Sequence, residues 1–349
     1  MNTTKFDIQR LIRNNVKGLK PYSSARDEYV SDGSEMVFLD ANENPYENGV
    51  NRYPDPQQRT LKTVLAEQKG VDIKNILLGN GSDEVLDLLF RAFCEPKEDN
   101  VITLPPTYGM YKVLANINNI EEREVILNSD FEPDTGKILK AIDARTKIIF
   151  LCSPNNPTGN SFSDQRIIEI VRSFEGLVVI DEAYIDFSSQ KSWIHSIKEF
   201  PNLIVTHTLS KAYGMAGIRL GICYASPEII GVLNKIKPPY NVNELTQQRA
   251  LQKVSDQETV KKEVTTILEE RVKVIEALSE ISCIQHIYKT DANFVLVKVD
   301  DATLRYNQLL DNGIVIRNRH TQPLCENTLR FTIGSPVENK KLIHTLQSL

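Results

Sequence analysis

The segment HTLSKAYGMAGIRLG contains a lysine at a position that favours a chemical role. Lys211 lies in a short, glycine-rich connection between two apolar runs, Leu203–Val205 and Leu220–Tyr224. A lysine at the carboxyl end of a strand becomes an amine nucleophile when neighbouring cations or the loss of water lower its pKa. Arg219 supplies such a cation and, with Ser210, could hold a phosphate. The alternative is an exposed lysine in a flexible turn.

A carboxylate that follows an apolar run supplies the complementary charge. Asp181 ends the run Leu177–Ile180, so its carboxylate is expected to be partly desolvated and to need a cationic partner. Such a group keeps the ring nitrogen of pyridoxal phosphate protonated, so that the ring can act as an electron sink. Together with a Schiff-base lysine and a phosphate site, it indicates that cofactor. Metal binding by Asp181 and Glu182 is the rival interpretation, although no histidine lies nearby in the sequence to complete a site.

Further polar and aromatic residues fit the same cofactor. Asn156 and Tyr184 could each donate a hydrogen bond to the phenolic oxygen of the ring, and Tyr108 could stack on its face. In GNGSDE the glycines permit a tight turn into a helix, where Ser82 and Asp83 lie at an end suited to an anion. A well-capped helix and ordinary tyrosine packing are the plain alternatives. GNGSDE is neither a Walker loop nor a full dinucleotide fingerprint, which disfavours nucleotide binding.

These clusters share a position relative to the elements that must hold them. GNGSDE, NNPTG, DEAY and the serine–lysine pair each follow a short apolar run, at the edge where open α/β sheets bind ligands. Apolar runs alternate with helical patterns, which predicts a mainly parallel sheet buried on both faces. The expected strands are Ile76–Leu78, Val101–Leu104, Glu124–Leu127, Ile148–Cys152, Leu177–Ile180, Leu203–Val205 and Leu220–Tyr224.

The pattern changes toward both ends of the chain. Apolar residues at helical spacing predict an amphipathic helix over 6–19 and a long helix over 260–278. The runs Phe294–Val299, Ile314–Arg317 and Leu329–Ile333 are typical of strands in a second, smaller unit. The sequence therefore predicts an α/β fold. We expect residues 1–40 to form an N-terminal arm and part of the small domain, 41–245 a large domain with a central sheet flanked by helices, and 246–349 a small α+β domain.

Bulk composition excludes several classes of protein. The chain has 349 residues, of which 41% are hydrophobic and 25% charged, and its formal net charge of −5 comes without a basic run typical of nucleic-acid binding. The N-terminus has no uninterrupted apolar stretch as long as that of a signal peptide, and no apolar stretch is long enough for a membrane span. The five cysteines are far apart and fit neither a disulfide framework nor a zinc site. These features predict a cytoplasmic protein without a metal site.

The motifs resemble those of the fold-type I pyridoxal-phosphate aminotransferases. The superfamily resemblance rests on SPNNPTG, DEAYIDF and SKAYGMAGIRLG in this order and spacing. It extends from PYSSAR (21–26) to the last helix and, within the family, is greatest to the enzymes that transaminate histidinol phosphate with 2-oxoglutarate in histidine biosynthesis. The further motifs are LDANENP (39–45), NRYPDP (51–56), GNGSDE, PPTYGMY, GIVIR (313–317) and LRFTIG (329–334).

The resemblance implies a role for individual residues. Lys211 is implied to hold the cofactor and move the α-proton, and Asp181 to face the ring nitrogen. Arg330, helped by Arg317, is implied to bind the substrate anion, and a surface cation is the alternative for Arg317. The cofactor-binding residues are implied to be Ser82, Asp83 (through its backbone), Tyr108, Asn156, Tyr184, Ser210 and Arg219. A homodimer is implied, with Tyr53 and the N-terminal arm, including Tyr22, reaching the partner's site.

Two other functions share these features. An aminotransferase of aromatic amino acids or a phosphothreonine decarboxylase would keep Lys211 and Asp181 and differ in the substrate pocket. A ligand-sensing module of the same fold would bind without turnover, but such regulators are fused to a DNA-binding domain. Only about 40 residues precede LDANENP, which disfavours the sensor.

Overall fold

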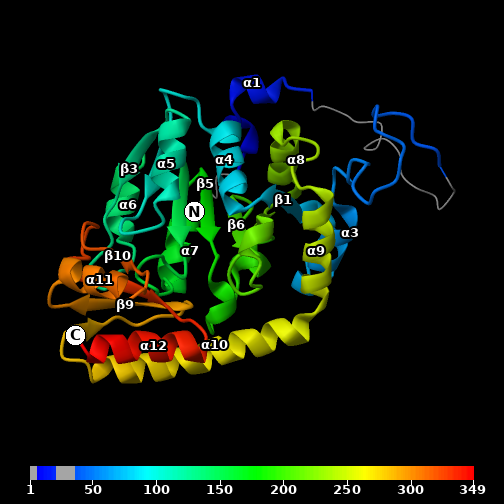
Figure 1. Cartoon of the computed structure of the whole chain (residues 1–349). Helices are drawn as coiled ribbons and strands as arrows, with labels where there is room; N and C mark the ends of the chain where they lie inside the picture. The colour runs from blue at the N-terminus through cyan, green and yellow to red at the C-terminus, as the bar shows by residue number, and fades with distance from the viewer. Residues whose placement is uncertain (1–5, 21–35) are drawn as a thin grey trace.

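The structure is a computed structural model and describes residues 6–20 and 36–349. In this part of the chain the strands form a seven-stranded and a four-stranded sheet (Figure 1). The larger sheet has the spatial order β1 (Ile76–Asn80), β7 (Leu220–Tyr224), β6 (Leu203–Thr208), β5 (Leu177–Asp181), β4 (Thr146–Cys152), β2 (Asn100–Thr103) and β3 (Glu121–Glu124).

The larger sheet is mainly parallel, as predicted. Strands β3, β2, β4, β5 and β6 pair in parallel, whereas β7 is antiparallel to both β6 and β1. Because β7 reverses direction relative to both neighbours, β1 runs the same way as β6. The carboxyl ends of β1, β4, β5 and β6 therefore meet at one edge of the sheet.

Both faces of this sheet are buried, because alternate strand residues point to opposite sides. Val178 and Ile180 of β5 belong to one apolar core, and Leu177 and Val179 belong to the other. The first core is covered by α3 (Arg59–Lys69), α6 (Thr135–Ala141), α7 (Asp164–Ser173) and α9 (Glu244–Ser255). The second is covered by α1 (Asn14–Lys17), α4 (Ser82–Phe93), α5 (Met110–Ile117) and α8 (Pro227–Ile236).

A long helix joins the two sheets. Helix α10 (Gln257–Ser279) places Val260 in the first core of the large sheet and Val274 and Leu278 in the core of the small one. Figure 1 shows it running beneath both parts of the molecule. The small sheet has the order β10 (Arg317–Asn318), β11 (Thr328–Thr332), β9 (Phe294–Val299) and β8 (Ile284–Ile287), and it packs with α11 (Ala302–Asp311) and α12 (Pro336–Gln347). The domain boundaries at 40 and 245 remain a prediction.

The helix predicted over 6–19 is wrong as one element. It is split into a 3₁₀ turn, η1 (Ile8–Arg10), and the short α1. Arg13 between them is extended, with φ −55° and ψ 144°. Its N–H donates to the carbonyl of Ala92, and its guanidinium pairs with Glu95 at 3.3 Å, so contacts with α4 and the segment after it override the helical pattern.

Two strand predictions are displaced. In place of 124–127 the edge strand is β3, the charged segment EERE, because an edge strand pairs through its backbone and tolerates charge. Val125 and Leu127 are buried just beyond it. In place of 314–317 the strand β10 contains only Arg317 and Asn318, whose pairing with β11 sets its length.

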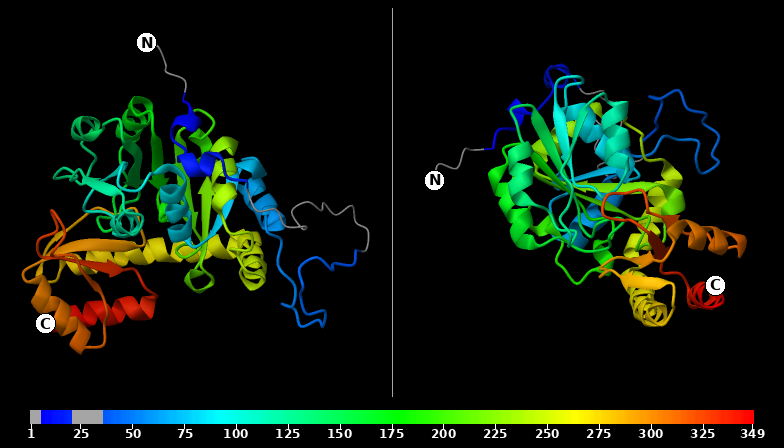
Figure 2. Two further views of the ribbon diagram at one scale, coloured as in Figure 1. Left: turned by 90° about the horizontal axis from the view of Figure 1, so that it is seen from above. Right: turned by 90° about the vertical axis from the view of Figure 1, so that its left-hand side faces the viewer.

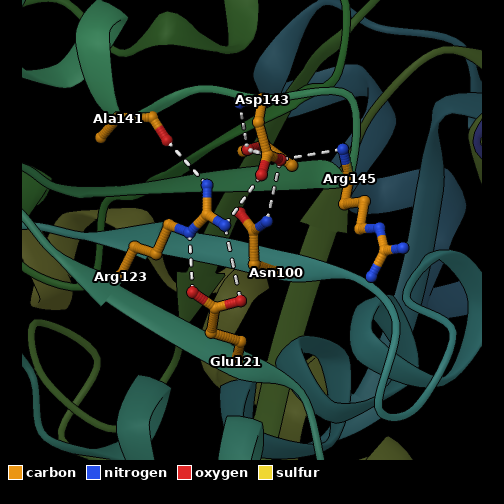
Figure 3. Close-up of polar contacts among 7 residues, drawn as sticks. Asn100, Glu121, Arg123, Ala141, Asp143 and Arg145 are labelled. Atoms are coloured by element: carbon orange, nitrogen blue, oxygen red, sulfur yellow. Dashed lines mark hydrogen bonds and ion pairs between the residues drawn. The ribbon is translucent and has the colours of Figure 1, made fainter.

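A polar network links the strands at the amino-terminal edge of the large sheet, opposite the edge where the carboxyl ends meet (Figure 3). Asp143 accepts hydrogen bonds from Asn100 Nδ2 at 3.0 Å and from the N–H of Arg145 at 2.9 Å. Arg123 lies 2.8 Å from the Asp143 carboxylate and also pairs with Glu121. These donors, Asn100 first, hold the pKa of Asp143 well below its usual range. The network joins β2, β3 and the turn before β4, so we assign it to the scaffold.

Lys62 of α3 is a buried cation, and its burial has a measurable effect on the stability of the fold. Its side chain is buried beside Lys237, and burial, then the Lys237 charge, lowers the pKa of Lys62 to about 8. The unfolded chain binds this proton more tightly than the folded one, so the ammonium destabilises the fold by about 3 kcal/mol below pH 8. That cost fades between pH 8 and 10.5.

We therefore expect Lys62→Met to raise the free energy of unfolding at pH 7, with the gain disappearing toward pH 10.5. Urea unfolding at both pH values measures it. A gain in the free energy of unfolding that grows with pH would contradict a lowered pKa for Lys62.

Candidate active site

The polar clusters expected at the strand ends meet at the carboxyl edge of the large sheet. Lys211 lies just after β6, and the charges of Arg330, Asp181, Arg219 and Asp83 all act on its amine. The N–H of Gly81, in the turn after β1, donates to the carbonyl of Arg219 at 2.9 Å. Residues far apart in the sequence are thus brought together as predicted.

Asp181 is a buried carboxylate at the end of β5, with an exposed fraction of 3%. The hydroxyl of Tyr111 donates to its Oδ2 at 2.9 Å, and the N–H of Ala183 donates to its Oδ1 at 3.2 Å. Burial raises the pKa of Asp181, against the opposing effect of the Tyr111 hydrogen bond. Both donors are neutral, so the site favours a cationic group beside Asp181.

Lys211 has the environment of a nucleophilic or basic amine. Its Nζ lies 5.6 Å from the centroid of the Tyr184 ring. Partial burial, followed by the charge of Arg330, lowers the pKa of Lys211, while Asp181 opposes the shift. The lysine is exposed as a residue, so a substrate can reach it. A lowered pKa increases the fraction of neutral amine near neutral pH, which is the reactive form.

The start of α4 forms a cradle for an anion. At Gly221 an added Cβ would lie 2.2 Å from the backbone nitrogen of Ser82, so only glycine allows β7 to approach the helix so closely. Arg219 adopts a left-handed conformation with φ 55°, and its guanidinium lies 3.3 Å from the carboxylate of Asp83. Free helix N–H groups and a guanidinium are the donors that phosphate prefers.

Asp83 and Tyr108 are connected in a way the sequence did not indicate. The Tyr108 hydroxyl donates to Asp83 Oδ1 at 2.9 Å, and burial, followed by Asp83, raises the pKa of Tyr108. The Asp83 side chain is therefore engaged by Tyr108 and Arg219, which leaves its backbone N–H for an anion.

Ser210 lies in the same loop as Lys211. Its Oγ accepts a hydrogen bond from the Thr208 hydroxyl at 3.0 Å. The donor set of this edge, together with the buried carboxylate, fits pyridoxal phosphate.

The small sheet closes the site from the other side. Arg330 of β11 donates through Nη1 to the side-chain oxygen of Asn156, and its guanidinium lies 5.0 Å from the centroid of Phe294. Tyr184 contacts the same Phe294 edge to face, with ring centroids 5.1 Å apart. Asn156, Tyr184 and Arg330 are therefore brought together.

The remaining predicted residues are Tyr53, Arg317 and Tyr22. Tyr53 stacks on Tyr240 with ring centroids 4.4 Å apart. Arg317 is opposite Arg330 in the β10–β11 pairing, but its side chain is exposed. Tyr22 lies outside the described residues. A hollow of about 420 Å³ lies away from Lys211, between the N-terminal segment near Tyr53 and the start of α9.

Three further residues of this region, Tyr111, Phe294 and Arg319, were not predicted as site residues. Tyr111 is in the PPTYGMY motif, but its contact with Asp181 depends on α5 packing across the sheet, where its ring stacks on Phe150 at 4.8 Å. Phe294 was assigned only to a strand. Arg319 follows β10 and is half-buried near Arg330 and Tyr184. Residue spacing alone gives no signal for any of these contacts.

Comparison with known proteins identifies a family that covers most of the chain. The model of the aminotransferase class I and II family matches residues 33–346. The histidinol-phosphate aminotransferase of Flavobacterium johnsoniae is 64% identical over 350 residues and covers 100% of both chains.

Solved structures show the same fold. That of the histidinol-phosphate aminotransferase from Clostridium acetobutylicum has a TM-score of 0.80 at 25% identity and covers 86% of this chain and 90% of that one. The enzyme from Sinorhizobium meliloti, in complex with pyridoxal-5'-phosphate, has a TM-score of 0.79 at 24% identity and covers 85% and 82%.

The contact between Tyr111 and Asp181 has a matched control in Tyr224. Both tyrosines are fully buried, but the Tyr224 hydroxyl has no hydrogen-bond partner among the described residues. We expect Tyr111→Phe to lower the free energy of unfolding by about 1–3 kcal/mol, because the Asp181 carboxylate loses a donor.

Tyr224→Phe should be neutral or stabilising, since it removes an unpaired hydroxyl. Chemical denaturation at pH 7 measures both variants. Equal losses in the two would contradict a specific role for the Tyr111 hydroxyl.

Proposed function

The chain belongs to the class I and II aminotransferase family, and from this premise we propose that it transfers the amino group of L-histidinol phosphate to 2-oxoglutarate. The products are imidazole acetol phosphate and L-glutamate, and the reaction is a step of histidine biosynthesis. The cofactor is pyridoxal 5'-phosphate. The full-length similarity to the Flavobacterium johnsoniae enzyme supports the choice of substrate.

One observation carries the proposal. A lysine with a lowered pKa, a buried carboxylate and an anion cradle lie at one sheet edge, with Arg330 of the second sheet beside them. In fold-type I enzymes this combination serves the cofactor and an anionic amine substrate.

Each side chain would have a role toward the cofactor. Asp181 would face the ring nitrogen, Tyr108 would stack on the ring, and Asn156 and Tyr184 would donate to the phenolic oxygen. Lys211 would hold the cofactor. Ser82, the backbone of Asp83, Ser210 and Arg219 would bind the phosphate. When bound, the cofactor supplies the electron sink that acidifies the Cα–H bond of the substrate.

The protein moves the proton and orients the substrate. With the cofactor bound, Lys211 Nζ would take the proton from the substrate Cα as the general base, and the resulting ammonium would be the general acid for the later proton transfer. Its lowered pKa keeps a neutral amine available for the first step. Arg330 binds the carboxylate of glutamate in one half-reaction and, helped by Arg317, the phosphate of histidinol phosphate in the other.

We propose that the active form is a homodimer. The segment from residue 36 to α3 extends away from the body of the molecule (Figure 2). It exposes large apolar side chains, including Val37, Leu39 and Tyr46, with exposed fractions of 80%, 87% and 81%. The exposed apolar side chains support a dimer in which a second copy covers this segment, and in which Tyr53 and the arm that contains Tyr22 reach the partner's site.

Two observations bear on where the enzyme works. All the cysteines of the sequence lie in the described part of the chain, where they are unpaired and buried. Among the described residues, no helix combines the length and apolar character needed to cross a bilayer. The free thiols support a reducing compartment, and we propose the cytoplasm.

A spectroscopic half-reaction tests the proposed function. Adding L-histidinol phosphate alone to the cofactor-loaded protein should bleach its visible absorption band, and 2-oxoglutarate should restore it. Bleaching only by an aromatic amino acid would replace the substrate, and release of carbon dioxide without need for an oxo-acid would indicate a decarboxylase. The absence of any visible band after addition of pyridoxal phosphate would reject the enzyme proposal.

The lysine variant completes this test. Lys211→Ala should lower turnover by at least about a thousandfold, because it removes both the attachment point and the proton-transfer group. The matched control is Lys191→Ala, which removes an exposed lysine and should leave turnover unchanged. Retention of turnover in Lys211→Ala would reject this lysine as the base.

A further inference from the structure

A group of arginines shares one side of the small sheet beside the site. Arg317 is opposite Arg330 in the pairing of β10 with β11. The N–H of Arg319 continues this pairing by donating to the carbonyl of Thr328 at 2.9 Å. Because alternate residues of a strand point to the same side, Arg317, Arg319 and Arg330 all lie on one face.

The charges of Arg319 and Arg330 lack compensation in the described part of the chain. The Nε atoms of both guanidinium groups are buried and have no hydrogen-bond partner there. Burial, followed by the charges of Arg330 and Arg317, lowers the pKa of Arg319 to about 10. Arg330 donates to Asn156, whose side-chain oxygen is neutral. Like charges brought together in this way favour the binding of an anion.

The backbone of Arg319 is fixed by hydrogen bonds beside the site. Its carbonyl accepts a hydrogen bond from the N–H of Gln322 at 2.9 Å, so its backbone is fixed on both sides. The charges of Arg330 and Arg319 both act on the hydroxyl of Tyr184, which lies near Lys211. The side chain of Arg317, in contrast, is exposed. Arg319 is therefore the better placed of the two β10-side arginines to support Arg330.

We propose that Arg319 is a further substrate-binding residue, which joins Arg330 in holding the phosphate of the amine substrate. The assignment rests on the proposed function. A phosphate ester near neutral pH carries close to two negative charges and three acceptor oxygens, which can engage two guanidinium groups. The carboxylate of glutamate carries one charge and two oxygens, which the fork of Arg330 satisfies alone. Arg319 thus favours the phosphorylated substrate over the carboxylate in a shared pocket.

The test compares both substrates in one variant. In the holoenzyme, Arg319→Gln should raise KM for histidinol phosphate by at least about tenfold, because a charge-assisted contact is lost. KM for glutamate and both kcat values should change by less than about threefold, on the same scale of contact energies. The unchanged glutamate reaction also shows that the variant folds. Arg319→Lys should recover part of the loss, since it keeps the charge without the fork.

Arg172→Gln is the matched control for the loss of one positive charge, because Arg172 is a surface residue paired with Glu199. It should leave both KM values unchanged. Equal increases for the two substrates in Arg319→Gln, or no increase for histidinol phosphate, would overturn the assignment.

A binding measurement separates this assignment from the proposed function. Inorganic phosphate, titrated calorimetrically into the holoenzyme, should bind more weakly to Arg319→Gln than to the unsubstituted protein. If the unsubstituted holoenzyme does not turn over histidinol phosphate, the proposed function fails. The titration then decides the anion site alone: weaker binding in the variant supports it, and equal binding overturns it.

Discussion

The buried carboxylate of Asp181 is the constraint on which the rest of the site depends. It lies at the end of a central strand, where burial raises its pKa and disfavours the charged form. Tyr111 and the N–H of Ala183 hold it in place without neutralising it. An unpaired charge in such a place costs several kcal/mol, and a cationic ring nitrogen would remove that cost. The fold thus buries the Asp181 carboxylate without a cationic partner among the described residues, and the ring nitrogen of a cofactor can become that partner.

On the other side of the site, partly buried cations likewise lie without a carboxylate partner in the described part of the chain. Lys211, Arg330 and Arg319 all have lowered pKa values, with burial as the first cause and a neighbouring cation as the second for Lys211 and Arg319. The scaffold edge differs, because there Arg123 is paired with the carboxylates of Glu121 and Asp143 (Figure 3). Unmatched charge is therefore concentrated where anionic ligands are expected, a cost in stability that favours binding.

The sequence predicted the parts of the fold and site that depend on local pattern. Asp181 and Lys211 could be placed at one edge because each follows an apolar run, and the end of a buried strand fixes where its next residue lies. Contacts that depend on packing were missed. Tyr111 reaches Asp181 only because α5 packs on one face of the sheet, and Arg13 breaks the first helix through contacts with Ala92 and Glu95. The position of Arg319 depends on the pairing after β10, which spacing does not reveal.

The claim that the Asp181 carboxylate lacks a cationic partner is tested by measuring the stability of Asp181→Asn with and without pyridoxal phosphate. The substitution keeps the shape of the side chain, and the Tyr111 hydroxyl can turn to accept a hydrogen bond from the new amide. We expect the cofactor-free variant to be at least as stable as the unsubstituted protein at pH 7, because the buried carboxylate that lacks a cationic partner has been removed. We also expect the gain in Tm on adding cofactor to shrink, because affinity for the cationic ring is lost. A less stable cofactor-free variant with an undiminished gain would contradict the claim.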